Sequence, residues 1–121
     1  MNIQIGIDLV EIGRIQKSLQ NPRFLTRVFS KDERDLFARM RDAVPTIAAN
    51  FAAKEAFSKA LGTGVRGFLL AEVSVLRNEL GAPYLALSGQ AQKLAEGLCF
   101  SVSLTHTEHY ASAVVVAYSA D

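Results

Sequence analysis

The stretch Phe51-Ala52-Ala53-Lys54-Glu55-Ala56-Phe57-Ser58-Lys59-Ala60-Leu61-Gly62-Thr63-Gly64 decides how the chain is organised. From Ile47 onward the residues are mostly Ala, Lys, Glu and Phe, and all of these except the aromatic residues favour helix strongly. Pro45 suits a helix N-terminus, and Gly62 suits the position just after a helix end. The pattern predicts a long helix from Ile47 to Leu61, followed by a flexible Gly-Thr-Gly turn.

The N-terminal segment has a different period. Apolar side chains recur at every second position, at Ile3, Ile5, Ile7 and Leu9. This alternation predicts a strand over residues 3–10, with Asp8 on the face opposite the isoleucines. Residues 11–19 are predicted to form a short helix, which Asn21-Pro22 ends.

The remaining segments predict one more helix in the first half and a strand-rich second half. Ser30-Lys31-Asp32-Glu33 is a capping box, which marks a helix start. The second half predicts a helix from Ser88 to about Glu96, and strands over residues 73–76, 84–87, 100–105 and 110–118. This order of elements predicts an α+β fold, with a largely antiparallel sheet and helices packed on it.

Composition excludes several classes of protein. The length of 121 residues predicts a single domain over residues 1–121. A net charge of +1 gives no reason to expect a nucleic-acid partner, and no apolar run approaches the ~20 residues that a membrane span needs. The single cysteine, Cys99, cannot form an internal disulfide, and no secretion signal is visible. We therefore expect a cytoplasmic protein.

Three charged residues could form a site for a metal and a phosphate. Glu55 and Lys59 are four residues apart and share a face of the predicted helix. Two carboxylates are a typical Mg²⁺ site when waters and substrate phosphates complete it, so Asp8 and Glu55 fit if the fold brings them together. In a plainer interpretation, Asp8 is a solvated strand-end residue or caps a helix, and Glu55 forms an exposed ion pair with Lys59.

The other candidates are less specific. Gly62-Thr63-Gly64 would let backbone amides approach a phosphate, but the turn ends a helix, and glycines also simply stop helices. His106 and His109 could bind a phosphate or transfer a proton, or be solvated loop residues. The sequence has no His/Cys cluster with zinc spacing and no dinucleotide-binding Gly motif. Residue chemistry alone therefore predicts a small α+β domain that could hold a metal at two carboxylates.

Four motifs, taken in order, resemble the holo-acyl-carrier-protein synthase family, the short trimeric type of 4′-phosphopantetheinyl transferase. The strand Gly6-Ile7-Asp8-Leu9-Val10-Glu11-Ile12 and the helix over residues 51–64 are the strongest pair. Residues 81–89 and residues 101–113 are similar to the family's later turn, strand and hairpin. The resemblance implies a 4′-phosphopantetheinyl transferase-like fold. It also implies Mg²⁺-dependent transfer of 4′-phosphopantetheine from coenzyme A to a serine of apo acyl carrier protein, in support of fatty acid biosynthesis.

The resemblance assigns roles to single residues. Asp8 and Glu55 match Mg²⁺-binding carboxylates and Lys59 matches a lysine near the transferred phosphate, so these three are the predicted catalytic residues. Arg14 and Arg23 match a basic region that docks the acidic carrier protein. The positions that match coenzyme A-binding residues are Lys59, Gly62, Pro83, Ser103, Thr105 and His106. The family is a homotrimer with active sites between subunits, which implies the same assembly here.

One position departs from the family pattern. Members usually carry Arg immediately before the aromatic residue of the second motif, whereas this chain has Asn50. A guanidinium contact to the coenzyme A phosphates must then come from elsewhere, and Arg39 or Arg41 could supply it.

Two other functions fit the same residues. A Mg²⁺-dependent pyrophosphate hydrolase would use both carboxylates with water as nucleophile, and would turn over without a carrier protein. A non-catalytic coenzyme A or carrier-protein binding module would use Asp8 and Glu55 as structural charges, and would bind coenzyme A equally well without Mg²⁺. The sequence does not distinguish Mg²⁺ from Mn²⁺.

Overall fold

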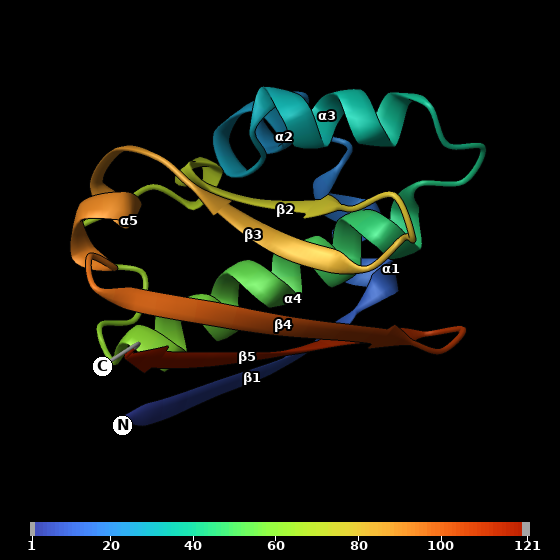
Figure 1. The fold of residues 1–121 in the computed structure, drawn as a ribbon. Coiled ribbons are helices and arrows are strands. Elements are labelled where there is room, and N and C mark those ends of the chain that lie inside the picture. Colours follow the sequence, from blue (N-terminus) through green and yellow to red (C-terminus); the bar gives the residue numbers. More distant parts are fainter. Residues whose placement is uncertain (1, 120–121) are drawn as a thin grey trace.

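The structure, a computed structural model, describes residues 2–119 (Figure 1). Its helices and strands follow the predicted order, with one additional α-helix and a short 3₁₀ helix. The elements are β1 (Ile3–Glu11), α1 (Ile12–Ser18), α2 (Arg23–Val28), α3 (Lys31–Ala38), α4 (Val44–Leu61), η1 (Leu70–Glu72), β2 (Val73–Arg77), β3 (Pro83–Leu87), α5 (Gly89–Leu94), β4 (Leu98–His106) and β5 (Tyr110–Ser119).

The strands form two antiparallel sheets, so the α+β prediction is confirmed but the single sheet becomes two. One sheet has the order β1-β5-β4, and the other is the β2-β3 hairpin. β1 pairs with β5 along its whole length, with Ile3 opposite Tyr118 and Glu11 opposite Tyr110. In Figure 1, α4 runs between the hairpin and the three-stranded sheet, and α2 and α3 lie beyond the hairpin. The long central helix is therefore covered on both sides.

β1 approaches α4 closely because it carries no side chain at the contact. Gly6 is buried, and a Cβ atom at this position would lie only 1.9 Å from the backbone oxygen of Ala56. The buried residues of α4 are also mostly small, including Ala49, Ala52, Ala53, Ala56 and Ala60. Asp8 follows Gly6 by two residues, so it lies on the strand face that meets α4.

The opposite face of β1 is open. Burial alternates along the strand as predicted, with Asp8 on the packed face and the isoleucines on the other. Four large apolar side chains are more than half exposed there: Ile3 at 54%, Ile5 at 64%, Ile7 at 62% and Leu9 at 64%. Apolar rows of this kind are enriched at surfaces that contact other molecules.

The local signals at the helix ends are mostly confirmed. Ser30 Oγ accepts from the backbone N–H of Glu33 at 3.2 Å, and the Glu33 carboxylate accepts from the Ser30 N–H at 3.0 Å, which completes the capping box. Gly62 ends α4 with a φ of 78°, a left-handed conformation that glycine adopts without strain. α4 starts at Val44, three residues before the predicted start.

Two features differ from the sequence prediction. Residues 23–28 form α2, which starts directly after Pro22, and Asn21 Oδ1 accepts from the Arg23 N–H at 3.0 Å. Ser88 occupies the N-cap of α5, but its side chain makes no capping hydrogen bond. The carboxylate of Glu72 accepts from the Gln90 N–H at 3.1 Å instead. A cap supplied from a distant element leaves no local sequence pattern.

A buried ion pair joins α3, α4 and β2. Lys54 Nζ lies 2.6 Å from Glu33 Oε1, and both side chains are fully buried. Glu33 Oε2 accepts from Asn50 Nδ2 at 3.0 Å and from the Val75 N–H at 3.2 Å. Lys54 also donates to the carbonyl oxygens of Leu70 and Val73. Lys54 therefore stabilises the buried core, although its neighbour in the sequence is Glu55.

No helix within residues 2–119 has both the length and the apolar character required to cross a membrane.

Candidate active site

The structure brings Asp8, Glu55 and Lys59 together where β1 meets α4. Lys59 Nζ lies 3.1 Å from Asp8 Oδ1 and donates to the Ile7 carbonyl oxygen at 2.8 Å. Partial burial raises the pKa of Glu55, and the nearby negative charge of Asp8 raises that pKa further, while Lys59 acts in the opposite direction. The two carboxylates are thus close enough to repel each other.

The partner of Lys59 contradicts the ion pair that the plainer interpretation assigned to it. Lys59 pairs with Asp8, and the ion pairs within 4.0 Å in residues 2–119 do not include Glu55 with Lys59. Strand pairing also holds Asp8 in place. Asp8 pairs with Ala113 of β5, and the backbone carbonyl oxygen of Asp8 accepts a hydrogen bond from Ser112 Oγ at 2.8 Å. Asp8 is therefore fixed by two strands and caps no helix.

The donor set of this site suits a hard divalent cation. Carboxylate oxygens are the ligands that Mg²⁺ prefers, usually one or two of them with waters and substrate phosphates. Within residues 2–119 no cluster of three or more His, Cys, Asp and Glu side chains could enclose a metal. Asp8 and Glu55 are the two carboxylates of this site, and an ion held there would take its other ligands from waters or a substrate.

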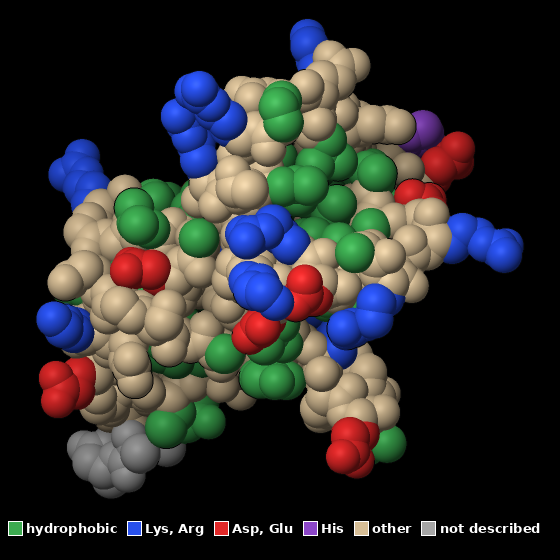
Figure 2. Space-filling model, turned by 90° about the horizontal axis from the view of Figure 1, so that it is seen from above, with side chains coloured by type: hydrophobic (Ala, Val, Ile, Leu, Met, Phe, Trp, Pro, Cys, Tyr) green, Lys and Arg blue, Asp and Glu red, His purple; other side chains and the backbone are tan. Residues whose placement is uncertain are grey.

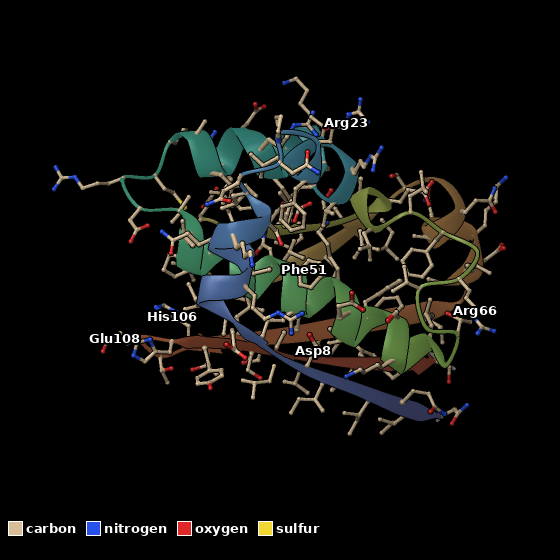
Figure 3. All side chains as sticks on the ribbon, turned by 180° about the vertical axis from the view of Figure 1, so that it is seen from behind. Asp8, Arg23, Phe51, Arg66, His106 and Glu108 are labelled. Atoms are coloured by element: carbon tan, nitrogen blue, oxygen red, sulfur yellow. The ribbon has the colours of Figure 1, made fainter. Side chains whose placement is uncertain are left out.

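The other predicted coenzyme A-binding residues do not all share one cleft. Pro83, Thr105 and His106 line a pocket of about 250 Å³ where the start of α4, the start of β3 and the end of β4 meet. Gly62 lies at the opposite end of α4, and Ser103 is exposed on β4 outside this pocket. Figure 3 shows His106 near the β4–β5 hairpin end, apart from Asp8 beside α4. The pocket is also smaller than the ~300–1,000 Å³ of typical ligand sites.

The two arginines predicted to dock the carrier protein lie on neighbouring short helices. Arg14 is on α1 and Arg23 is the first residue of α2, and both are exposed. Residues 12–28 contain four basic side chains and no acidic one. Arg14 also lines an apolar pocket of about 360 Å³ with Phe24 and Phe51. Figure 2, which looks down on the side of α2 and α3, shows a hydrophobic group with Lys and Arg side chains on one side and acidic and His side chains on the other.

His109, the other candidate histidine, is exposed in the β4–β5 loop. It lies 3.9 Å from Glu108, whose side chain is also exposed. The pocket that contains His106 does not include it. Its position agrees with a solvated loop residue.

Sequence reasoning missed Arg77. This residue ends β2, lines the pocket of Pro83 and His106, and donates from Nη2 to Asn50 Oδ1 at 2.9 Å. Arg39, one of the two arginines expected near Asn50, instead lines a separate groove with Asp32 and Asp35. Arg41 lies in the segment between α3 and α4 and does not line the pocket either. A lone basic residue before a turn carries no motif, so only the fold shows that Arg77 reaches Asn50.

Comparison with known proteins agrees with this architecture. The model of the 4′-phosphopantetheinyl transferase superfamily matches residues 4–115. The chain belongs to this superfamily. It is 43% identical over 120 residues to a protein of Treponema denticola named holo-[acyl-carrier-protein] synthase, an alignment that covers 96% of this chain and 98% of that protein.

Solved structures of the superfamily have the same fold. A holo-(acyl-carrier-protein) synthase of Bacillus anthracis, solved in complex with CoA (3′,5′-ADP), superposes with a TM-score of 0.84 at 32% identity and covers 97% of this chain and 96% of that one. The holo-[acyl-carrier-protein] synthase of Neisseria meningitidis gives a TM-score of 0.89 at 32% identity, covering 95% of this chain and 97% of that one. The α+β architecture is therefore that of this enzyme family.

Proposed function

We propose that this chain is a holo-[acyl-carrier-protein] synthase, supporting fatty acid biosynthesis. It transfers 4′-phosphopantetheine from coenzyme A to a serine of apo acyl carrier protein, and adenosine 3′,5′-bisphosphate leaves. The full-length relatives carry this name, and one related structure holds a coenzyme A ligand. The observation that carries the proposal for this chain is the Asp8–Glu55–Lys59 group at the contact of β1 and α4. We treat residues 1–121 as one transferase domain.

Asp8 and Glu55 are the proposed ligands of Mg²⁺. The fit rests on two carboxylates that repel each other, because a divalent cation between them would relieve that repulsion. When bound, Mg²⁺ supplies Lewis-acid polarisation of the pyrophosphate oxygens. Mn²⁺ prefers the same oxygen ligands, so the metal used in the cell is a matter for experiment.

Lys59 and Glu55 have separate proposed roles in the transfer. The bond between the serine oxygen and the β-phosphorus forms, and the bond from that phosphorus to the bridging pyrophosphate oxygen breaks. Lys59, held by Asp8 and the Ile7 carbonyl, would neutralise negative charge that develops on the transferred group. Glu55, directly or through a water, would accept the serine proton.

The coenzyme A site is proposed to lie between two subunits of a homotrimer. Within one chain, Asp8 and Lys59 lie apart from the pocket of Pro83, Thr105 and His106 (Figure 3). This pocket is too small for the whole coenzyme A molecule. The exposed isoleucine row of β1 offers an apolar surface for self-association. A neighbouring subunit would then complete each cleft, with Gly62 and Ser103 also bordering the nucleotide.

Arg14 and Arg23 are the proposed docking residues for the carrier protein. The four basic side chains of residues 12–28 would attract an acidic partner, and the adjoining pocket of Phe24 and Phe51 could receive an apolar side chain. We also propose a cytoplasmic location, supported by a single free cysteine, Cys99, where secreted proteins usually carry disulfides.

The direct test is the intact mass of a purified apo carrier protein after incubation with this protein, coenzyme A and Mg²⁺. A gain of one phosphopantetheine group, about 340 Da, that is lost with EDTA would support a metal-dependent transferase. Release of adenosine 3′,5′-bisphosphate without any carrier would indicate the hydrolase. Coenzyme A binding that is independent of Mg²⁺, with no mass gain on several carriers, would indicate the binding module.

Substitution of Asp8 tests the site itself. Asp8→Ala should abolish turnover while the protein stays folded, and Asp35→Ala, which removes an exposed carboxylate of α3, is the matched control. Retention of more than about a tenth of kcat by Asp8→Ala, a barrier change under ~1.4 kcal/mol, would contradict the metal role.

A further inference from the structure

The buried polar cluster behind the small pocket contains more positive than negative charge. Its single fully buried carboxylate, Glu33, already has Lys54 at 2.6 Å as its cation. Arg77 adds a second cation at the edge of the same cluster, through its hydrogen bond to Asn50. Within residues 2–119, the ion pairs shorter than 4.0 Å do not include Arg77. Arg77 therefore has no carboxylate in direct contact, and Glu33, Asp32 and Asp35 act on it only from a greater distance.

Asn50 holds this guanidinium in place. Its Nδ2 donates both to Glu33 Oε2 and to the Val75 carbonyl oxygen, each at 3.0 Å. These two acceptors determine which way the amide points, so Oδ1 must face Arg77, and it accepts from Nη2 at 2.9 Å. Arg77 is partly buried and starts from a strand, which restricts its motion further. Asn50 is thus a positioning residue for Arg77.

The pocket that Arg77 faces is chemically suited to an anion. Its lining combines Arg77 and His106 with the hydroxyl-bearing residues Thr46 and Thr105, and it includes no carboxylate. The groove on the other side of Arg77 is lined by Asp32 and Asp35, which would repel an anion. Guanidinium groups bind phosphates with short, charge-assisted hydrogen bonds. Arg77 can therefore bind a phosphate on the pocket side, where no carboxylate lines the pocket and no direct ion pair must be broken.

We infer that Arg77 binds a phosphate in the adenosine 3′,5′-bisphosphate half of coenzyme A, with Asn50 positioning it. This inference rests on the proposed coenzyme A site at Pro83, Thr105 and His106. It also accounts for Asn50, where the family usually has Arg. Arg77, at the end of β2, places a guanidinium beside Asn50 of α4. Neither Arg39 nor Arg41 lines this pocket.

The test compares the binding of adenosine 3′,5′-bisphosphate by the full-length protein and its Arg77→Gln variant, using titration calorimetry. Glutamine can still donate toward Asn50 but has no charge. We expect the Kd to rise at least about tenfold, as for the loss of a hydrogen bond to a charged group. The KM for coenzyme A should rise by a similar factor, with kcat little changed, because Arg77 is apart from the Asp8 site. Inhibition by 4′-phosphopantetheine, which lacks the nucleotide, should not change.

Three further variants keep the test decisive. Lys31→Gln removes an equal charge from the exposed surface of α3 and should leave the Kd unchanged. Arg77→Lys keeps the charge but loses the planar guanidinium with its paired donors, so we expect an affinity between those of the parent and Arg77→Gln. This variant still tests the role of Arg77 if Arg77→Gln folds poorly. The exchange Asn50→Arg with Arg77→Asn should restore most of the affinity by placing the guanidinium on α4.

An Arg77→Gln variant that is folded and binds adenosine 3′,5′-bisphosphate as tightly as the parent would overturn the role of Arg77 alone. A parent protein that does not bind this nucleotide would overturn the proposed coenzyme A site as well. The two failures are therefore distinguishable in one experiment.

Discussion

The variant Lys54→Met removes a buried cation and leaves its carboxylate partner in place. Lys54 Nζ lies 2.6 Å from Glu33 Oε1 and donates to two backbone carbonyls, and both side chains are fully buried. Methionine fills a similar volume with apolar atoms, so packing is largely kept. The change therefore isolates the electrostatic part of the contact.

The expected loss in the free energy of unfolding depends on the hydrogen bonds that Glu33 retains. Removing one partner of a buried ion pair typically costs about 3–5 kcal/mol. Glu33 retains hydrogen bonds from Asn50, from the Val75 N–H and from the Ser30 N–H, which favours the lower end of that range. The Leu70 and Val73 carbonyls lose a donor, which adds to the cost. We expect a loss of about 4 kcal/mol, a large part of the ~5–15 kcal/mol that stabilises a typical domain.

Urea unfolding followed by circular dichroism measures this loss. The protein concentration must be held constant, because self-association would contribute to stability. Adding Glu33→Gln to Lys54→Met should recover part of the loss, since no buried charge then remains. Lys31→Met breaks the exposed Lys31–Asp35 pair and should leave the unfolding midpoint nearly unchanged. A loss below about 1 kcal/mol for Lys54→Met would refute the reasoning.

The remaining predictions concern the site and the surfaces. Gly6→Ala should destabilise the fold by about 1–3 kcal/mol in urea unfolding and lower kcat, because the added Cβ would push β1 and Asp8 away from Ala56; unchanged activity would contradict this. The double variant Arg14→Glu, Arg23→Glu should raise the KM for the carrier protein without changing kcat, and added salt should reduce the difference; an effect independent of salt would argue against charge-guided docking. Ile7→Lys should shift the protein to a smaller species in sedimentation, and an unchanged assembly would exclude the β1 face as an interface.

Local sequence signals predicted most of the fold. The alternation in residues 3–10, the Ser30–Glu33 capping box and the Gly62 stop each depend on interactions between near neighbours, and the structure confirms all three. α2 was missed because Pro22 was interpreted only as the end of the preceding helix, although proline also suits a helix start. The division into two sheets depends on long-range packing, which local patterns do not encode.

Residue chemistry suggested the candidate site and the resemblance assigned its roles, but only the structure shows the contacts of its side chains. Lys54 and Glu55 are adjacent residues of one helix, yet one is fully buried beside Glu33 and the other faces Asp8. Nothing in their spacing distinguishes them. In the plainer interpretation Lys59 pairs with Glu55, but in the structure it pairs with Asp8 of strand β1. Such choices of partner depend on segments about 50 residues apart in the chain.

The pairing of β1 with β5 has a consequence for how the protein folds. β1 is an edge strand whose sheet partner is β5, so Asp8 lies opposite Ala113, far along the chain. The hydrogen bond from Ser112 Oγ to the Asp8 carbonyl oxygen joins residues 104 positions apart, and contacts of such separation form slowly. α4 can wind much earlier, because its hydrogen bonds are local. Glu55 and Lys59 are therefore in place on a helix before Asp8 joins them, and the candidate site forms only when β1 pairs with β5.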